Sequence, residues 1–127
     1  MTKETLSNPF LNLLKEENLR KTWHNNEWWF AIKDLIDLLT TTANPTDYIK
    51  KMRVKDPILS QKWADLVIQL PVETRGGKQN LPCTNAEGLF RIVQSIPSPR
   101  AEPFKKWLAK TAYLHVLELK DASVTAP

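Results

Sequence analysis

The chain has 127 residues, of which 42% are hydrophobic and 25% are charged, and it carries a formal net charge of +4. This is the material of one soluble domain. No apolar run approaches the roughly 20 residues that span a bilayer, and residues 1–15 hold no apolar segment of the kind found in a signal peptide. The single cysteine, Cys83, excludes an intrachain disulfide. We therefore expect an intracellular protein with no membrane association.

The positive charge is concentrated in one part of the chain. Residues 45–110 carry 12 basic and 6 acidic side chains, whereas the segments on either side are neutral or slightly acidic. This uneven distribution favours a polyanionic partner more than the net charge does. A solvated basic face without any partner is equally consistent with the charge alone.

The first 18 residues predict a short helix or an extended arm, which Pro9 interrupts. The clearest element comes next. Two apolar-polar segments, Leu19 to His24 and Glu27 to Ala31, flank the pair Asn25-Asn26. Asparagine tolerates the positive φ that both central residues of a type I′ turn require, so this pattern predicts a β-hairpin.

In that hairpin Trp23 lies opposite Trp28, with Leu19 and Phe30 on the same face, and Trp29 points to the other side. Cross-strand aromatic pairs stabilise small sheets. We expect the aromatic cluster to belong to the core, in preference to a platform for a ligand.

Two helices should follow. The first is indicated by four apolar residues at helical spacing, Ile32, Leu35, Ile36 and Leu39. It ends in the threonines that follow residue 39. The second begins with Asn44 as N-cap and Pro45 at the first helical position, and Asp56-Pro57 ends it. Its inward residues are Tyr48, Ile49 and Met52. Its remaining surface is basic: Lys50, Lys51, Arg53 and Lys55.

Residues 60–65 predict a further short helix around Trp63. Val67 to Val72 has the alternation of a strand, and Pro71 argues for an edge position because proline has no N–H for the ladder. Residues 75–78 (Arg-Gly-Gly-Lys) predict a tight turn, with a return strand over residues 80–83.

Thr84-Asn85-Ala86-Glu87 has the form of a capping box, with Thr84 as N-cap and Glu87 at the third helical position. The inward residues of this helix are Leu89, Phe90, Val93 and Ile96. Pro97 and Pro99 end it, and the last helix begins between Ser98 and Pro103. The pattern predicts one small α+β domain over residues 19–121, with two β-hairpins packed with four to five short helices, after an arm or helix at 1–18 and before a frayed tail at 122–127.

The sequence contains few candidates for catalytic residues. His24 and His115 are far apart in the chain, and Cys83 lies in a predicted strand, where a buried structural thiol is commoner than a nucleophile. The three glycines, at 76, 77 and 88, do not build a phosphate-binding loop. We expect no catalytic residue, no metal and no cofactor, and therefore not an enzyme.

Three cationic segments are candidates for binding DNA. They are the basic helix 45–55, the Gly-Gly turn with its flanking cations, and the region around the start of the last helix, where Ser95 and Ser98 could also donate to phosphate oxygens. Arg91 is expected on the outward face of its helix. The candidate residues are Lys50, Lys51, Arg53, Lys55, Arg75, Lys78, Arg91, Arg100, Lys105 and Lys106, with Lys110 beside them.

Three segments together resemble the N-terminal domain of the BRO family. They are WHNNEWWFA with KDLI at residues 23–36, YIKKMR at 48–53, and NAEGLFRIVQSIPSPRAEPFKKWLA at 85–109. The third is the most specific, and Ile49 departs from the family pattern, which commonly has an aromatic residue there. The resemblance covers about residues 19–115.

This resemblance implies a compact α+β module that binds DNA, found in phages, prophages and large DNA viruses, where many members are antirepressors. It suggests the cytoplasm of a bacterial or phage-infected cell. The leading hypothesis is binding of double-stranded DNA without catalysis. The alternative is a protein-interaction module that captures a repressor or another phage or host regulator, with Trp29 and Trp63 as exposed anchors. Self-association into an oligomer is left open.

Overall fold

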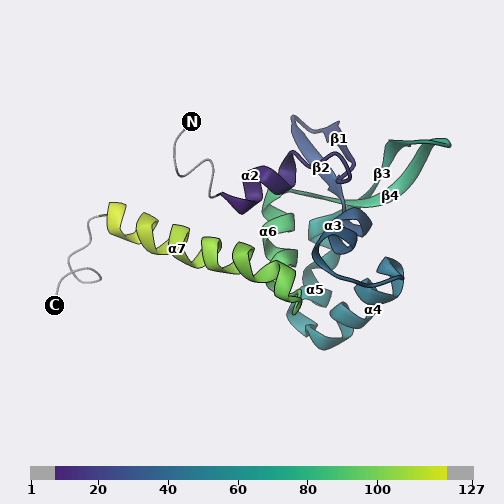
Figure 1. The fold of residues 1–127 in the computed structure, drawn as a ribbon. Coiled ribbons are helices and arrows are strands. Elements are labelled where there is room, and N and C mark those ends of the chain that lie inside the picture. The colour runs from purple at the N-terminus through teal and green to yellow at the C-terminus, as the bar shows by residue number, and fades with distance from the viewer. Residues whose placement is uncertain (1–7, 120–127) are drawn as a thin grey trace.

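The structure, a computed structural model, describes residues 8–119. Figure 1 shows helices gathered below and beside a small sheet, with one long helix projecting away. The elements are α2 (Pro9–Leu14), β1 (Lys21–His24), β2 (Glu27–Ala31), α3 (Ile32–Leu39), α4 (Pro45–Lys55), α5 (Pro57–Leu66), β3 (Val67–Thr74), β4 (Gly77–Asn85), α6 (Ala86–Gln94), the 3-10 turn η1 (Pro99–Ala101) and α7 (Glu102–Glu118).

This arrangement confirms the α+β class and both hairpins. The arm or helix predicted for residues 1–18 contains α2, and its first seven residues lie outside the described part of the chain, as does the tail predicted at 122–127. Residues 8–119 contain six α-helices, and α7, with 17 residues, is longer than the short helices expected. The helix expected at 60–65 extends over the whole of α5.

The two hairpins form one antiparallel sheet with the strand order β1-β2-β4-β3. The strands β1 and β3 are at opposite edges of this order and nevertheless contact each other, because the sheet is curled. Pro71 lies in the edge strand β3, as predicted, so its missing N–H costs no ladder hydrogen bond with a further strand.

The first hairpin has the predicted turn and register. Asn25 and Asn26 adopt φ values of 50° and 62°, and Trp23 pairs with Trp28. The second hairpin turns earlier than expected. The strands close on the pair Thr74–Gly77, with a φ of +96° at Gly77, so β4 begins three residues before the predicted return strand.

The main core lies between the helices and one face of the sheet. It contains the predicted inward residues of α3 and α6, together with Phe10, Leu13 and Leu59 from helices that cover it. All four predicted positions of α3 are buried. Phe90 is an exception to the prediction for α6, because it is only half-buried and Ile92 is fully buried instead.

A second, smaller cluster belongs to the sheet itself. It consists of Trp29, Ala31, Leu70, Val72, Leu81 and Cys83, which alternate along their strands with residues of the main core or the surface. Trp29 also donates a hydrogen bond from its indole Nε1 to the carbonyl oxygen of His24, at 3.1 Å. The root of the β3–β4 hairpin is therefore anchored by apolar packing, and its outer end from residue 73 to residue 80 stands free of the core.

The N-cap of α6 is Asn85, not Thr84. The Asn85 side chain accepts a hydrogen bond from the N–H of Gly88 at 2.9 Å. Thr84 remains in strand β4, paired with Phe30 on one side and Val67 on the other, and its fully buried hydroxyl has no hydrogen-bond partner. Pairing in the sheet therefore keeps Thr84 in strand β4, although the capping pattern predicted it as the N-cap of the helix.

Helix α2 fastens the start of α7 to α6. The Phe10 ring packs edge-on against Phe90, Phe104 and Trp107, with centroid distances of 4.4, 5.1 and 5.2 Å. Beyond this aromatic cluster α7 projects away from the body (Figure 1), and Tyr113 and Leu114 on it are exposed.

Candidate nucleic-acid interface

Helix α4 carries the densest group of exposed cations. Its start is defined as predicted, because the Asn44 side chain accepts a hydrogen bond from the N–H of Asp47 at 3.1 Å. Burial of Ile49 and Met52 turns one side of the helix to the core and leaves the lysines on the other. The exposed lysines are Lys50, Lys51 and Lys55.

One of these lysines has an acidic neighbour. Lys51 lies 3.0 Å from Asp47 on the preceding turn, with the two side chains 72% and 50% exposed. An exposed pair of this kind contributes only about 0.3–0.5 kcal/mol. A phosphate can therefore replace Asp47 as the partner of Lys51 at little cost.

Asp56 forms the junction between α4 and α5. Its backbone N–H donates to the carbonyl of Met52, which ends α4, and its side chain accepts from the N–H of Leu59 at 3.0 Å, which starts α5. The Ser95 hydroxyl, at the end of α6, donates to the same carboxylate at 2.6 Å. This hydrogen bond from Ser95, with those from Leu59 and Arg91, lowers the pKa of Asp56. The carboxylate therefore joins three helices while it stays charged.

The guanidinium of Arg53 lies over the indole of Trp63, with its central carbon 4.8 Å from the ring centroid. Both side chains are half-buried, and the Nε atom of Arg53 is buried without a hydrogen-bond partner. Trp63 is consequently covered by its own chain, and Trp29 is 8% exposed. The expectation that Trp29 and Trp63 form exposed anchors is wrong.

The β3–β4 hairpin presents the second group of cations. Arg75 occupies the turn, and Lys78 lies in β4 directly opposite Glu73 of β3. All three side chains are exposed. In Figure 1 this hairpin and α4 lie on the same side of the molecule, away from the projecting end of α7.

The third predicted group is divided between structural and exposed residues. Arg91 donates to the Ser95 hydroxyl at 2.7 Å and lies 3.4 Å from the Asp56 carboxylate, so it is not on an open outward face. Arg100 donates to the carbonyl of Thr40 at 3.2 Å, which satisfies the end of α3. The remaining members lie on α7: Lys105 is half-exposed, and Lys106 and Lys110 are exposed.

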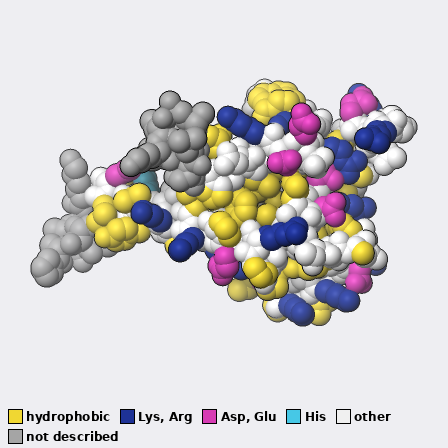
Figure 2. All heavy atoms as spheres, viewed as in Figure 1, with side chains coloured by type: hydrophobic (Ala, Val, Ile, Leu, Met, Phe, Trp, Pro, Cys, Tyr) yellow, Lys and Arg dark blue, Asp and Glu magenta, His cyan; other side chains and the backbone are white. Residues whose placement is uncertain are grey.

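The cations therefore form two classes. Arg53, Arg91 and Arg100 are held by contacts within the domain, although Arg100 is also exposed. The lysines of α4, the two cations of the hairpin, Lys106 and Lys110 are exposed, and Lys105 is half-exposed. Figure 2 shows Lys and Arg side chains distributed over this face, with acidic groups between some of them. Lys62 on α5 is a further exposed lysine outside the three predicted cationic segments.

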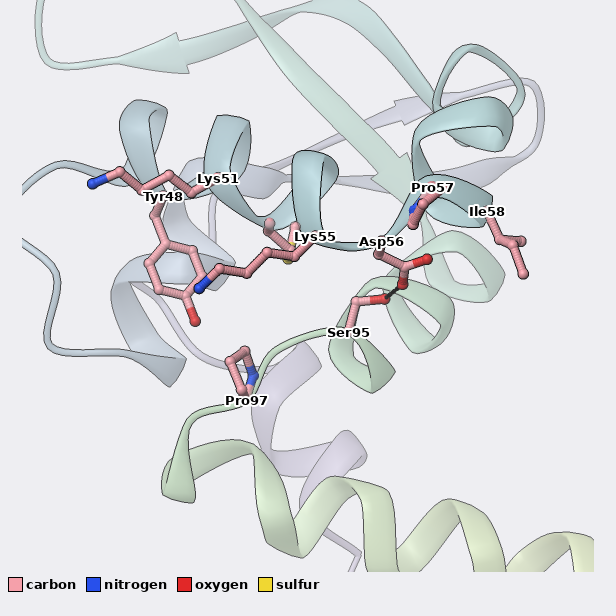
Figure 3. Close-up of a pocket in the computed structure, with 9 residues that line it drawn as sticks. Tyr48, Lys51, Lys55, Asp56, Pro57, Ile58, Ser95 and Pro97 are labelled. Atoms are coloured by element: carbon pink, nitrogen blue, oxygen red, sulfur yellow. Dashed lines mark hydrogen bonds between the residues drawn. The ribbon is translucent and has the colours of Figure 1, made fainter.

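A pocket of about 570 Å³ opens beside α4. Figure 3 shows Tyr48, Lys51 and Lys55 from α4 on one side, Pro57 and Ile58 at the start of α5, and Ser95 and Pro97 across the opening. Met52 is the remaining apolar residue of the lining. Two of the lysines of the candidate interface therefore stand at the mouth of an apolar cavity.

The aromatic pair of the first hairpin is exposed, contrary to the expectation that it belongs to the core. Trp23 and Trp28 are 58% and 47% exposed and pack edge-to-face with ring centroids 5.1 Å apart. Lys21 lies 5.7 Å from the Trp28 ring centroid. Figure 2 shows hydrophobic side chains at the outer end of this hairpin.

Within residues 8–119, no three His, Cys, Asp or Glu side chains gather where they could hold a metal ion. Cys83 is fully buried, as the sequence indicated, and burial raises the pKa of its thiol to about 11. In the same range no helix has the length and apolar character needed to cross a membrane.

These features define a small α+β domain with a cationic helix and a protruding cationic hairpin on one side. Residues 18–114 match the BRO family, N-terminal domain, and the chain belongs to this family. The match confirms the resemblance that the sequence motifs carry. Neither the curated proteins nor the solved structures gave a significant match.

Proposed function

We propose that this BRO-type domain binds double-stranded DNA without catalysis, as the DNA-contacting part of a phage- or prophage-type antirepressor-like regulator in the cytoplasm of a bacterial or phage-infected cell. The observation that carries the proposal is the pairing of a lysine-rich helix, α4, with a cationic hairpin tip on one side of the domain. Helices and two-stranded ribbons are the elements that fit the major groove, and lysines neutralise phosphates on either side of it.

The exposed cations are the proposed contacts. Lys50, Lys51 and Lys55 would neutralise phosphates along α4, and Arg75 and Lys78 would do so at the hairpin tip, where Gly76 and Gly77 let the backbone approach closely. Lys105 and Lys106 extend the surface onto α7. Arg53, Arg91 and Arg100 were also predicted from the sequence to contact DNA. In this proposal they hold the elements of the domain in position, because each already has a partner within the domain.

The test is a titration of the purified domain against a fluorescently labelled duplex of about 20 base pairs at several salt concentrations. We expect binding that weakens steeply with salt, since each neutralised phosphate contributes about −0.9 to the slope of log K against log salt. Replacing Lys50, Lys51 and Lys55 together by alanine should reduce the magnitude of that slope by about 2–3. Absence of binding at about 50 mM salt would refute the proposal.

Lys15 provides the matched control. It is exposed, lies just after α2, and is followed by Glu16 and Glu17. Lys15→Ala removes the same charge as a single α4 substitution but should leave the slope unchanged. An equal effect of Lys15→Ala and Lys50→Ala would mean that net charge, and no particular surface, determines binding.

The second candidate function is capture of a repressor or another phage or host regulator. The exposure of the Trp23–Trp28 pair favours it, because large exposed aromatic side chains are common anchors at protein interfaces. In that case Trp23→Ala and Trp28→Ala would abolish binding of the partner protein, salt would have little effect, and DNA binding by the domain would be unchanged.

A further inference from the structure

We propose that the cavity beside α4 binds an acidic peptide segment that inserts one large apolar side chain. The cavity lies between α4, the first residues of α5 and the segment 95–97 (Figure 3). Its volume of about 570 Å³ lies within the range of roughly 300–1,000 Å³ typical of ligand pockets. Its apolar lining comes from Met52, Pro57, Ile58 and Pro97, with the Tyr48 ring at one end.

The charge at the opening selects an anionic partner. Asp56 is the one acidic residue of the lining, and its two oxygens already accept hydrogen bonds from Leu59, Ser95 and Arg91. The carboxylate is thus largely compensated within the domain. Lys55 extends across the opening toward Tyr48, and Lys51 points outward from the preceding turn (Figure 3).

Duplex DNA does not match an apolar cavity with two lysines at its opening. Phosphates can pair with Lys51 and Lys55, but a duplex presents charge at its backbone and little apolar surface beyond the thymine methyl group, so the cavity floor would stay empty. Ile58 lines the cavity at its edge, and because it is 62% exposed it extends the apolar surface onto the rim. An occupant that fills the cavity and also covers this rim is a peptide with carboxylates flanking an apolar side chain.

Such a peptide would neutralise two of the lysines that the proposed DNA surface uses. Peptide and DNA should therefore compete, and this consequence rests on the proposed function, whereas peptide binding itself does not. Binding of an acidic partner segment would then release DNA without any change of fold.

The experiment uses fluorescein-labelled ten-residue peptides with one central Phe or Leu and two Asp on each side, titrated with the domain in the absence of DNA. A peptide with Ala in the central position should bind about tenfold more weakly, since most of its apolar contact area is lost. The affinity for the Phe or Leu peptide should fall about tenfold or more in the Lys51→Ala/Lys55→Ala variant and about fivefold in Ile58→Ser.

Val54 supplies the matched control, because it is 80% exposed, lies next to Lys55 on α4 and does not line the cavity. Val54→Ser should bind the peptides as the wild type does. Equal binding of the Ala peptide, equal losses in Val54→Ser and Ile58→Ser, or no saturable binding at millimolar peptide would each overturn the proposal. Phenylacetate that binds as tightly as the Phe peptide would also overturn it, in favour of a small-molecule site.

A displacement titration then separates the two proposals. Release of a labelled duplex by the Phe peptide, but not by the Ala peptide, supports competition at the lysines. Peptide binding by a domain that does not bind DNA at all would refute the proposed function alone. DNA binding without peptide binding would refute the peptide site alone.

Discussion

Replacing Gly88 by alanine tests the contact between α6 and the sheet. A Cβ atom at this position would overlap the Thr84 Oγ1 atom, and it would also lie 3.3 Å from the Thr84 Cβ and 3.4 Å from the Asn85 Oδ1. Thr84 cannot retreat easily, because it is fully buried in a strand that is paired on both sides.

The expected change in the free energy of unfolding of Gly88→Ala combines two opposing effects. Alanine is a better helix former than glycine by about 1 kcal/mol. Overpacking of a closed core costs about 1–3 kcal/mol, and the upper end applies where a buried hydroxyl is overlapped by a new methyl group. Gly88→Ala should therefore lower the free energy of unfolding by about 2 kcal/mol.

Urea unfolding followed by tryptophan fluorescence measures this loss, provided that the m value is unchanged. In a Thr84→Ala background the overlap disappears, so Gly88→Ala should then be neutral or slightly stabilising. Gly76→Ala is the control, because its Cβ would have no neighbour closer than 3.9 Å and its φ is not positive. Equal losses in the Thr84 and Thr84→Ala backgrounds would refute the steric explanation.

Three further predictions concern titrating groups and an ion pair. The lowered pKa of Asp56 stabilises the fold above the ordinary carboxyl pKa, and this contribution is lost as pH falls through the folded pKa; urea unfolding should show that Asp56→Asn is less stable than the wild type at pH 7, with the difference vanishing in acid. Cys83, whose thiol pKa rises from 9.0 to about 11, should react with Ellman's reagent at pH 8 at least ~100-fold more slowly in the folded protein than in urea, and rapid reaction of the folded protein would contradict its burial. Asp34 accepts hydrogen bonds from the Arg20 Nε and Nη2 atoms, both at 2.8 Å, and because the Arg20 side chain is 39% exposed we expect Asp34→Asn to cost only about 1–2 kcal/mol. A double-mutant cycle with Arg20→Gln that shows no coupling would contradict this pairing.

The sequence correctly predicted the turns, helix starts and strand positions that depend on interactions between residues close together in the chain. The Asn25-Asn26 pair specified its turn, Asn44 and Pro45 marked the start of α4, and Pro71 indicated an edge strand. In each case the decisive interaction lies within a few residues of the signal, so one sequence is sufficient to recognise it.

The errors arise where distant segments decide the outcome. Thr84 and Asn85 both suit an N-cap, and pairing of β4 with β2 and β3 decides in favour of Asn85. Strand alternation places Trp23 and Trp28 on one face but does not reveal whether another segment covers that face, and here they are exposed.

The same limit applies to the candidate interface. In the sequence, Arg91 and Arg100 cannot be distinguished from the other cations. In the structure each contacts a group far away in the chain: Arg91 contacts Asp56, and Arg100 contacts the Thr40 carbonyl. The basic surplus between residues 45 and 110 therefore includes cations that already have a partner within the domain. The pocket beside α4 likewise depends on α6 and Pro97 meeting the α4–α5 junction, which no local pattern indicates.

The Asp56 junction gives α4 the geometry of a lever. The helix has 11 residues and is about 16 Å long, and its C-terminal end is attached where Asp56 meets Ser95. A rotation of about 10° around this point would move the far end of α4 by about 3 Å, which is comparable to the length of a hydrogen bond. A substitution at Ser95 removes this attachment, so that only the packing of Ile49 and Met52 then holds Lys50 and its neighbours in place. Loss of binding at normal stability would be the expected outcome of such a change.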